Sequence, residues 1–157
     1  MGPRINLATN KLFGAYAQHL VAANKVIETS SLPPTVHQLV LLRASQINGC
    51  AFCVDMHTKD AAAAGETHQR LHLVAAWREA TVFTEAERAA LELAEQGTRI
   101  ADGAGGVPDE VWDNAAKHFD EEQLAALVCT IALINAFNRG NLIAQQPAGF
   151  YQPGMFH

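Results

Sequence analysis

The sequence predicts an all-α fold, a helical bundle of about six to seven helices in a single domain over residues 1–157. Three observations predict it. Helix-forming Ala, Leu, Glu and Gln are abundant, and apolar residues recur at helical spacing. No segment sustains the alternation of apolar and polar residues that is typical of a half-buried strand. Prolines, glycines and capping residues divide the chain into segments of helical length.

Two helices are predicted before the first Asn-Gly pair. The first covers residues 8–28 and ends at SSLPP. The second runs over about 34–47, since proline is tolerated in the first turn of a helix. The first helix is expected to pack through one apolar stripe that comprises Leu12, Ala15, Tyr16, His19, Leu20 and Ala23.

The third and fourth helices are predicted on either side of Gly65. Asn48-Gly49 breaks the preceding helix, and the chain restarts at about Cys50. This third helix runs to about residue 64, where Gly65 is a suitable C-cap. The pair Asp55 and Lys59 on it is expected to face solvent. A fourth helix covers about 67–79.

Two capping boxes predict where later helices begin. Thr84 is followed three residues later by Glu87, and Asp120 by Gln123, so each pair can satisfy free backbone N–H groups of a first turn. The later helices are therefore expected over about 84–100, 109–118 and 120–142. The tail from Gln146 contains two prolines and three aromatic residues, and it is expected to pack on a neighbouring segment or a partner chain.

Composition limits the classes of function. Charged residues make up only 17% of the chain and hydrophobic residues 49%, whereas soluble domains have about 25% charged residues. Such a surface favours contact between copies of the chain, so we expect a homo-oligomer. The net charge of −5 and the lack of a Lys/Arg cluster argue against nucleic acid and against an anionic membrane. With no signal segment and no long apolar run, we expect a cytoplasmic protein without a membrane span.

Residues 48–57, NGCAFCVDMH, carry the main candidate site. Cys50, Cys53 and His57 are spaced i, i+3 and i+7, so they lie near one face of a helix. A thiol reacts as its thiolate, which the first turn of a helix, a second thiol and an imidazole one turn away all stabilise. The Cys-x-x-Cys spacing also permits an internal disulfide.

The residues alone leave three interpretations of this cluster open: a redox dithiol, half of a metal site, or small core residues. A zinc site needs four ligands, and the other candidates are the i, i+4 pair His68 and His72, together with Cys129. However, the chain has no second Cys-x-x-Cys, and His68 and His72 suit a solvent-facing helix equally well. Cys129, in LVCTIAL, is expected in the core. Surface or half-buried positions are expected for His19, His37 and His118.

The run LVLLRASQINGCAFCVDMHTKDAAAAGET resembles the core motif of the AhpD-like alkylhydroperoxidases, within the carboxymuconolactone decarboxylase superfamily. The core motif lies at residues 38–57. AAWREATVFTEAERAALELAE and NAFNRGN resemble the helices that follow it, so the resemblance covers about residues 30–145. It implies an all-α fold that assembles as a homotrimer or homohexamer. We expect no cofactor and no metal.

The resemblance also implies a function, that of a thiol-dependent peroxidase. Cys53 then corresponds to the attacking thiolate, Cys50 to the proton donor and resolving thiol, and His57 to a member of the proton relay. The expected substrate is a hydroperoxide. The expected electron donor is a dithiol or a disulfide reductase.

Two positions depart from the peroxidase pattern. Gln38 stands where family peroxidases begin the relay with a glutamate, and an amide cannot take up a proton at neutral pH. Phe52 stands where some members carry a histidine before the second cysteine. Because loss of one general base typically costs about 10²–10⁴-fold in rate, we expect either weak peroxidase turnover or a different substrate.

Three competing functions are weighed against the peroxidase. A disulfide oxidoreductase or electron-transfer adaptor would use the same dithiol on a partner protein. Cofactor-free decarboxylase or lactone chemistry occurs elsewhere in the superfamily, but without reliance on a cysteine pair. A non-enzymatic binding or structural oligomer would leave Cys50 and Cys53 inert towards alkylation at neutral pH.

Overall fold

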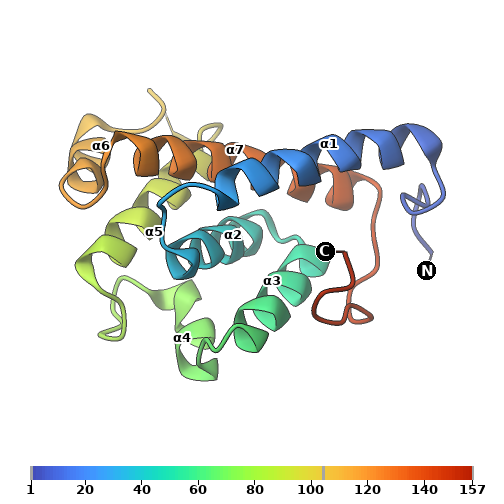
Figure 1. Cartoon of the computed structure of the whole chain (residues 1–157), viewed down its shortest axis with the longest axis horizontal. Helices are drawn as coiled ribbons and strands as arrows, with labels where there is room; N and C mark the ends of the chain where they lie inside the picture. Colours follow the sequence, from blue (N-terminus) through green and yellow to red (C-terminus); the bar gives the residue numbers. More distant parts are fainter. Residues whose placement is uncertain (1, 104, 157) are drawn as a thin grey trace.

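The structure, a computed structural model, describes residues 2–103 and 105–156 (Figure 1). Within these residues the regular structure is entirely helical, with seven α-helices and one short 3₁₀ helix, as the sequence predicts. The elements are α1 (Lys11–Glu28), α2 (Pro34–Asn48), α3 (Ala51–Ala63), α4 (His68–Leu73), η1 (Val74–Ala76), α5 (Glu85–Thr98), α6 (Asp109–Ala116) and α7 (Glu121–Ile143).

Capping chemistry within a few residues sets most helix ends. Both predicted capping boxes form, Thr84 with Glu87 at α5 and Asp120 with Gln123 at α7. The start of α1 differs from the prediction by three residues. It begins at Lys11, because the Asn10 side chain accepts a hydrogen bond from the Phe13 N–H and caps the helix there.

The predicted helix over 67–79 is wrong in its second half. The chain tightens into η1 and then turns. The guanidinium of Arg88 on α5 binds the carbonyl groups of that turn, donating to the carbonyl oxygens of Trp77 at 2.9 Å, Ala80 at 3.1 Å and Arg78 at 2.9 Å. This tertiary contact stabilises the turn that follows the shortened helix.

Helix α2 lies at the centre of the fold, packed against α3, α5 and α7 (Figure 1). Its neighbours surround it, so Leu39, Val40, Leu42 and Ala44 are all buried. One apolar cluster joins α2, α5, α6 and α7, and a second fills the space between α2, α3 and the α4–η1 segment. Helix α2 thus holds α3, which carries the candidate cysteines, against the body of the domain.

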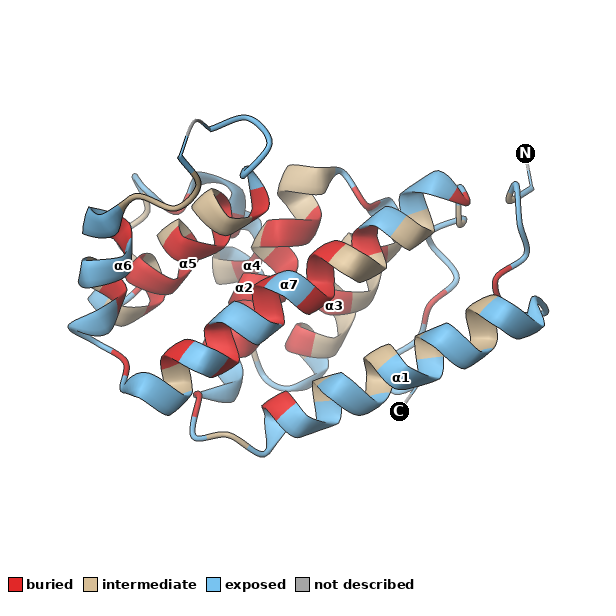
Figure 2. Cartoon of the chain, turned by 90° about the horizontal axis from the view of Figure 1, so that it is seen from above, coloured by how far each residue is buried: buried red, intermediate tan, exposed pale blue. Residues whose placement is uncertain are grey.

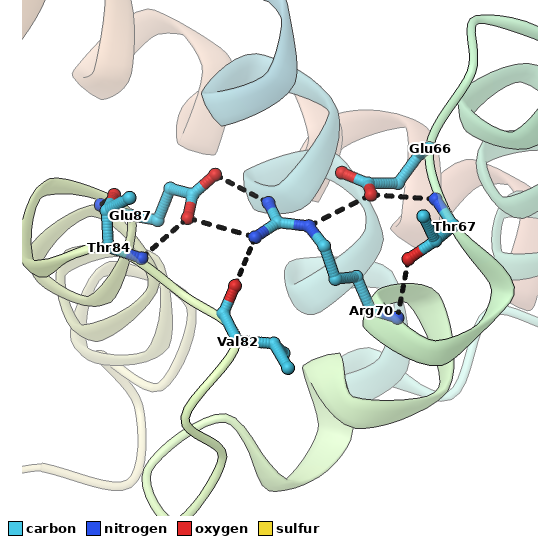
Figure 3. A network of polar contacts seen from close by, with 6 residues as sticks. All are labelled: Glu66, Thr67, Arg70, Val82, Thr84 and Glu87. Carbon is cyan, nitrogen blue, oxygen red and sulfur yellow. Dashed lines mark hydrogen bonds and ion pairs between the residues drawn. The ribbon is translucent and has the colours of Figure 1, made fainter.

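Polar side chains fix the two ends of α5. Arg70 of α4 donates to Glu66, to Glu87 and to the Val82 carbonyl, which ties α4 to the start of α5 (Figure 3). Further along α5, the Glu95 carboxylate accepts from Arg43 of α2, from Trp77 and from Arg78. Glu87 thus binds a cation from α4, and Glu95 binds cations from α2 and from the turn after η1, so these contacts orient the elements around α2.

Helix α1 packs along α7, and of the predicted stripe Leu20 packs against the core whereas Leu12 and Tyr16 do not. Leu12 is 82% exposed and Tyr16 is 46% exposed, and Figure 2 shows most of α1 as exposed. The inward side instead includes Ile27 and Phe13, whose ring lies against Gly140 of α7. Helix α1 is apolar on more than one side, so its periodicity could not indicate which side faces the core. The exposed side leaves apolar surface on the single chain.

Helix α7 is the long core helix, and it is apolar on nearly every side. Length and composition alone would allow it to cross a membrane. However, it packs against α1, α2, α5 and α6, and Asn135 and Asn138 are buried in those contacts. The prediction that Cys129 is a core residue is wrong. It lies on the exposed side of α7, next to exposed Val128.

Candidate functional site: the dithiol at the start of α3

Cys50 and Cys53 occupy the first turn of α3. Gly49 ends α2 in the left-handed conformation, with φ of 73°, and this reverses the chain into Cys50. Cys50 is the N-cap, and its Sγ accepts a hydrogen bond from the Cys53 backbone N–H at 3.3 Å. The two sulfurs are joined as a disulfide, with Cα atoms 5.3 Å apart. The spacing therefore places both sulfurs together, as the sequence predicted.

Burial shields this disulfide. Both cysteines are 1% exposed, so a substrate or reductant needs a local opening to reach either sulfur. His57 is one turn after Cys53 and is also buried, and the buried residues of α3 are Cys53, His57 and Ala61, which are spaced four apart. The predicted dithiol and histidine thus share the inward face of α3.

Gln38 lies near the start of α2, about ten residues or roughly 15 Å along the helix axis before the end of that helix at Asn48. Its side chain lines a hollow of about 250 Å³ formed with Ile27, Glu28, Leu32, Pro34 and His37. Its Oε1 is buried without a hydrogen-bond partner among the described residues.

His37 corrects another expectation, because it is buried and not a surface or half-buried residue. It is 5% exposed, since α2 is covered on all sides. Burial lowers the pKa of His37 below its ordinary value, although the negative charge of Glu28 acts in the opposite direction. The imidazole is therefore neutral at neutral pH.

Three asparagines of α7 connect that helix to the candidate site, and the sequence reasoning missed their role. Asn135, Asn138 and Asn141 are spaced three apart in NAFNRGN, which brings all three towards α2 and α3. The Asn48 amide, two residues before Cys50, donates to Oδ1 of Asn135 at 2.9 Å and of Asn138 at 2.8 Å. The sequence feature that could have indicated this role is the regular i, i+3, i+6 spacing of the three asparagines.

The same row of amides extends from a buried serine to the dithiol. Asn138 donates to Ser45 Oγ at 3.1 Å, and Ser45 donates to the Leu41 carbonyl at 2.7 Å. One turn further along α7, the Asn141 amide donates to Cys53 Sγ at 3.4 Å. Thus α7 contacts both the turn that precedes the dithiol and one sulfur of the dithiol.

The C-terminal tail packs against α3 of its own chain. The Phe52 ring, next to Cys53, lies 5.9 Å from the Phe150 ring and 6.2 Å from the Phe156 ring. Tyr151 is fully buried, and its hydroxyl donates to Asp60 of α3. We use the term aromatic cluster for Phe52, Phe150 and Phe156. This cluster covers the side of α3 next to the second cysteine.

Asp55 and Lys59 are more than a solvent-facing pair. They form an ion pair at 2.9 Å, and each also binds the tail backbone. Lys59 Nζ donates to the Tyr151 carbonyl at 2.8 Å, and Asp55 accepts from the Gly149 N–H at 3.0 Å. The hydrogen bond from Lys59 contributes most to lowering the pKa of Asp55. The expected solvated pair is in fact an attachment point for the tail.

The structure does not gather the residues that were considered for zinc. His68 and His72 lie on the exposed side of α4, and Cys129 is exposed on α7. Among residues 2–103 and 105–156, no group of three or more His, Cys, Asp or Glu side chains is placed to hold a metal ion.

Comparison with known proteins agrees with this fold. Residues 11–96 match the carboxymuconolactone decarboxylase family, and the chain belongs to that family. The uncharacterized protein YdfG of Bacillus subtilis is 46% identical over 115 residues, which cover 73% of this chain and 77% of YdfG. The uncharacterized protein YnjA of Escherichia coli is 35% identical over 119 residues, or 76% of this chain and 64% of YnjA.

Solved structures share the fold. ATU0492 of Agrobacterium tumefaciens, described as a putative antioxidant defence protein AhpD, is 35% identical with a TM-score of 0.84, covering 95% of this chain and 99% of its own. The debrominase Bmp8 is 20% identical with a TM-score of 0.76, covering 85% of this chain and 71% of its own. At that identity, Bmp8 is evidence of a common fold alone. The chain is therefore an AhpD-like member of the family.

Proposed function

We propose that this protein is a thiol-dependent peroxidase that reduces a hydroperoxide at Cys53. The observation that carries the proposal is the buried Cys50–Cys53 pair at the first turn of α3, where the two sulfurs can bond to each other. Membership of an AhpD-like family supports it. A helix N-terminus favours the thiolate that such chemistry needs.

The proposed reaction has two steps. The Cys53 thiolate attacks the outer oxygen of the hydroperoxide, so an S–O bond forms, the O–O bond breaks, and the alcohol leaves after it takes up a proton. Cys53 is now a sulfenic acid. The Cys50 thiolate then attacks the Cys53 sulfur, so the S–S bond forms, the S–O bond breaks, and the departing hydroxide takes up a proton and leaves as water. An external dithiol or a disulfide reductase supplies two electrons and two protons to restore both thiols.

The test is rapid mixing of fully reduced protein with hydrogen peroxide and, separately, with cumene hydroperoxide. We expect loss of two hydrogens in intact mass, mapped to Cys50–Cys53. Cys50→Ser should stop at a sulfenic acid, with a gain of one oxygen, and Cys53→Ser should consume no peroxide. Cys129→Ser is the matched control, because the third cysteine is exposed on α7 and outside the dithiol. Peroxide consumption that survives Cys53→Ser would refute the mechanism.

His57 and Gln38 are assigned roles in the proton relay of this mechanism. His57 accepts or returns a proton at the dithiol, and its position one turn after Cys53 supports that role. Gln38 is the weakened member, since an amide cannot hold a proton. Its side chain lines the hollow beside His37. Gln38→Glu therefore tests the relay: faster peroxide consumption would support it, and an unchanged rate would remove Gln38 from the mechanism.

We also propose that the chain assembles as a homotrimer or a homohexamer and that the protein is cytoplasmic. The exposed apolar side chains of α1 and α7, among them Leu12, Val26 and Val128, support an oligomer. Sedimentation of the purified protein tests it directly. A single-chain mass at micromolar concentration would contradict this part of the proposal.

A second candidate is a disulfide reductase or electron-transfer adaptor for a partner protein. The observation in its favour is that Phe150 and Phe156 of the aromatic cluster are half exposed beside the dithiol. Apolar rings beside a redox pair suit a protein surface as well as an organic hydroperoxide. Rapid thiol loss with a disulfide substrate, with thiols left free after many minutes in peroxide, would favour this candidate.

A further inference from the structure

We propose that Asn141 is a further catalytic residue, whose amide N–H binds the Cys53 sulfur and holds it as a thiolate. The inference rests on the proposed thiol chemistry at Cys53. Its starting point is the contact across the fold, 88 residues apart in sequence, in which Asn141 Nδ2 donates to Cys53 Sγ at 3.4 Å.

The Cys53 sulfur needs such a donor. Burial alone disfavours a thiolate, because the charge leaves water, and Cys53 is 1% exposed. Its own backbone N–H is directed to Cys50 Sγ, so it does not serve the Cys53 sulfur. The side chain of Asn141 supplies a donor from a different helix. This donor carries no charge, so it stabilises the anion without adding an ion to a buried site.

The other two asparagines fix the position of Asn141. Asn135 and Asn138 bind Asn48 at the end of α2, and Asn138 also binds Ser45. These contacts set the register of α7 against the turn that leads into Cys50. Asn141 is one turn further along α7, so its amide is already placed when the disulfide opens. A donor held in position before reaction costs no reorganisation during it.

Reduction should strengthen the contact. In the disulfide, Cys53 Sγ is a weak acceptor that shares a bond with Cys50 Sγ. When two electrons enter, that bond breaks, and the Cys53 sulfur becomes an anion that accepts a hydrogen bond more strongly. Asn141 therefore favours both a more reactive thiol and the reduced form of the pair.

The experiment measures the acidity of Cys53 without peroxide. In a Cys50→Ser, Cys129→Ser background, Cys53 is the only cysteine left of three. The rate of alkylation by iodoacetamide is followed from about pH 5 to about pH 10. The midpoint of this curve is the pH at which half of the Cys53 thiol is ionised. Asn141→Leu removes the amide at similar volume. Asn141→Asp keeps the shape but replaces the donor with an acceptor. The matched control is Asn24→Ala, which changes a helical asparagine that binds Glu28 on α1.

We expect Asn141→Leu and Asn141→Asp to raise the midpoint and to slow alkylation near pH 7 by about 10-fold or more, since a hydrogen bond to a charged group is lost. Asn24→Ala should leave the midpoint unchanged. Circular dichroism establishes whether each variant folds, and if Asn141→Leu does not fold, Asn141→Ala, which removes the amide without adding a charge, decides. An unchanged midpoint in a folded Asn141 variant overturns the inference.

Peroxide consumption by the otherwise unmodified chain separates the inference from the proposed function. If the unmodified chain fails to consume peroxide while the midpoint shifts in the Asn141 variants, the peroxidase proposal fails and the thiolate contact stands. If the chain consumes peroxide and the midpoint does not shift, the peroxidase stands and Asn141 has no catalytic role.

Discussion

Tyr151, in the C-terminal tail, donates its hydroxyl hydrogen bond to the Asp60 carboxylate of α3, with its oxygen 2.8 and 2.9 Å from the two carboxylate oxygens. Tyr151 is fully buried, whereas most of the tail around it is exposed. One ring thus anchors a segment that ends next to the dithiol. The contact links the tail to α3 on the turn after His57.

Replacing this anchor should loosen the tail. We expect Tyr151→Phe to lower the free energy of unfolding by about 1–3 kcal/mol, because the hydrogen bond to a charged carboxylate is lost while the ring stays. Urea unfolding measures the loss, and limited proteolysis should cut the tail sooner. The control is Tyr16→Phe, on the exposed side of α1, which should change neither. A tail equally resistant to protease in Tyr151→Phe would contradict the anchoring role.

Tyr151 should also titrate late. Burial, and next the Asp60 carboxylate, raise the pKa of Tyr151 to about 12. A phenol whose pKa is higher in the folded state stabilises the fold below the unfolded value of about 10, and that stability is lost as pH rises through about 12. Absorbance of the phenolate near 295 nm, followed through alkaline pH, should therefore show a late step that Tyr151→Phe removes. A titration curve in which Tyr151→Phe removes no late step would contradict this expectation.

The Glu95 carboxylate should make the free energy of unfolding depend on pH in the acidic range. Burial alone would raise the pKa of Glu95, but hydrogen bonds from Trp77, Arg43 and Arg78 outweigh it, and the pKa lies below the ordinary value. The stabilisation is therefore present above the unfolded pKa of about 4.5 and is lost as pH falls through the folded value. We expect Glu95→Gln to cost about 2–4 kcal/mol at neutral pH.

Urea unfolding at several pH values checks the Glu95 prediction. Part of the fall in stability below about pH 4.5 should disappear in Glu95→Gln, since the amide does not titrate. The matched control is Glu92→Gln, because Glu92 pairs with the half-exposed Arg78. Equal losses at positions 92 and 95 would show that the three-donor arrangement adds nothing.

The contact between Asn138 and Ser45 should couple α7 to α2. Both residues are fully buried, so Asn138→Ala leaves a cavity and unpaired polar atoms at Ser45 and Asn48. We expect a loss of about 2–4 kcal/mol. A double-mutant cycle with Ser45→Ala should give a coupling energy of about 0.5–3 kcal/mol. Strict additivity of the two losses would mean that the 3.1 Å contact does not stabilise the fold.

Gly49 should be sensitive because of its backbone conformation. Its φ is 73°, and a Cβ there would meet no atom within 4 Å, so the cost of substitution is conformational and not steric. We expect Gly49→Ala to destabilise the protein by about 1–2 kcal/mol. Because Gly49 leads directly into Cys50, alkylation of the reduced dithiol should also change. Gly103→Ala, at a glycine without positive φ, is the control for a loop glycine.

The sequence by itself determined the helices and the dithiol. The capping boxes at Thr84 and Asp120, the stop at Gly49 and the pairing of Cys50 with Cys53 all depend on groups within about four residues of each other. Such contacts form in the same way whatever the rest of the chain does. For this reason the all-α class and most helix boundaries agree with the structure.

Only the tertiary structure decided which helix faces are buried and which residues contact the cysteine sulfurs. Helices α1 and α7 are apolar on several sides, so the pattern could not show that Leu12 and Cys129 face outward. The contact of Asn141 with Cys53 and the packing of Tyr151 on α3 join residues about 90 positions apart. Local hydrogen bonding fixes the elements, but the choice among several apolar faces depends on which surfaces meet when the whole chain packs.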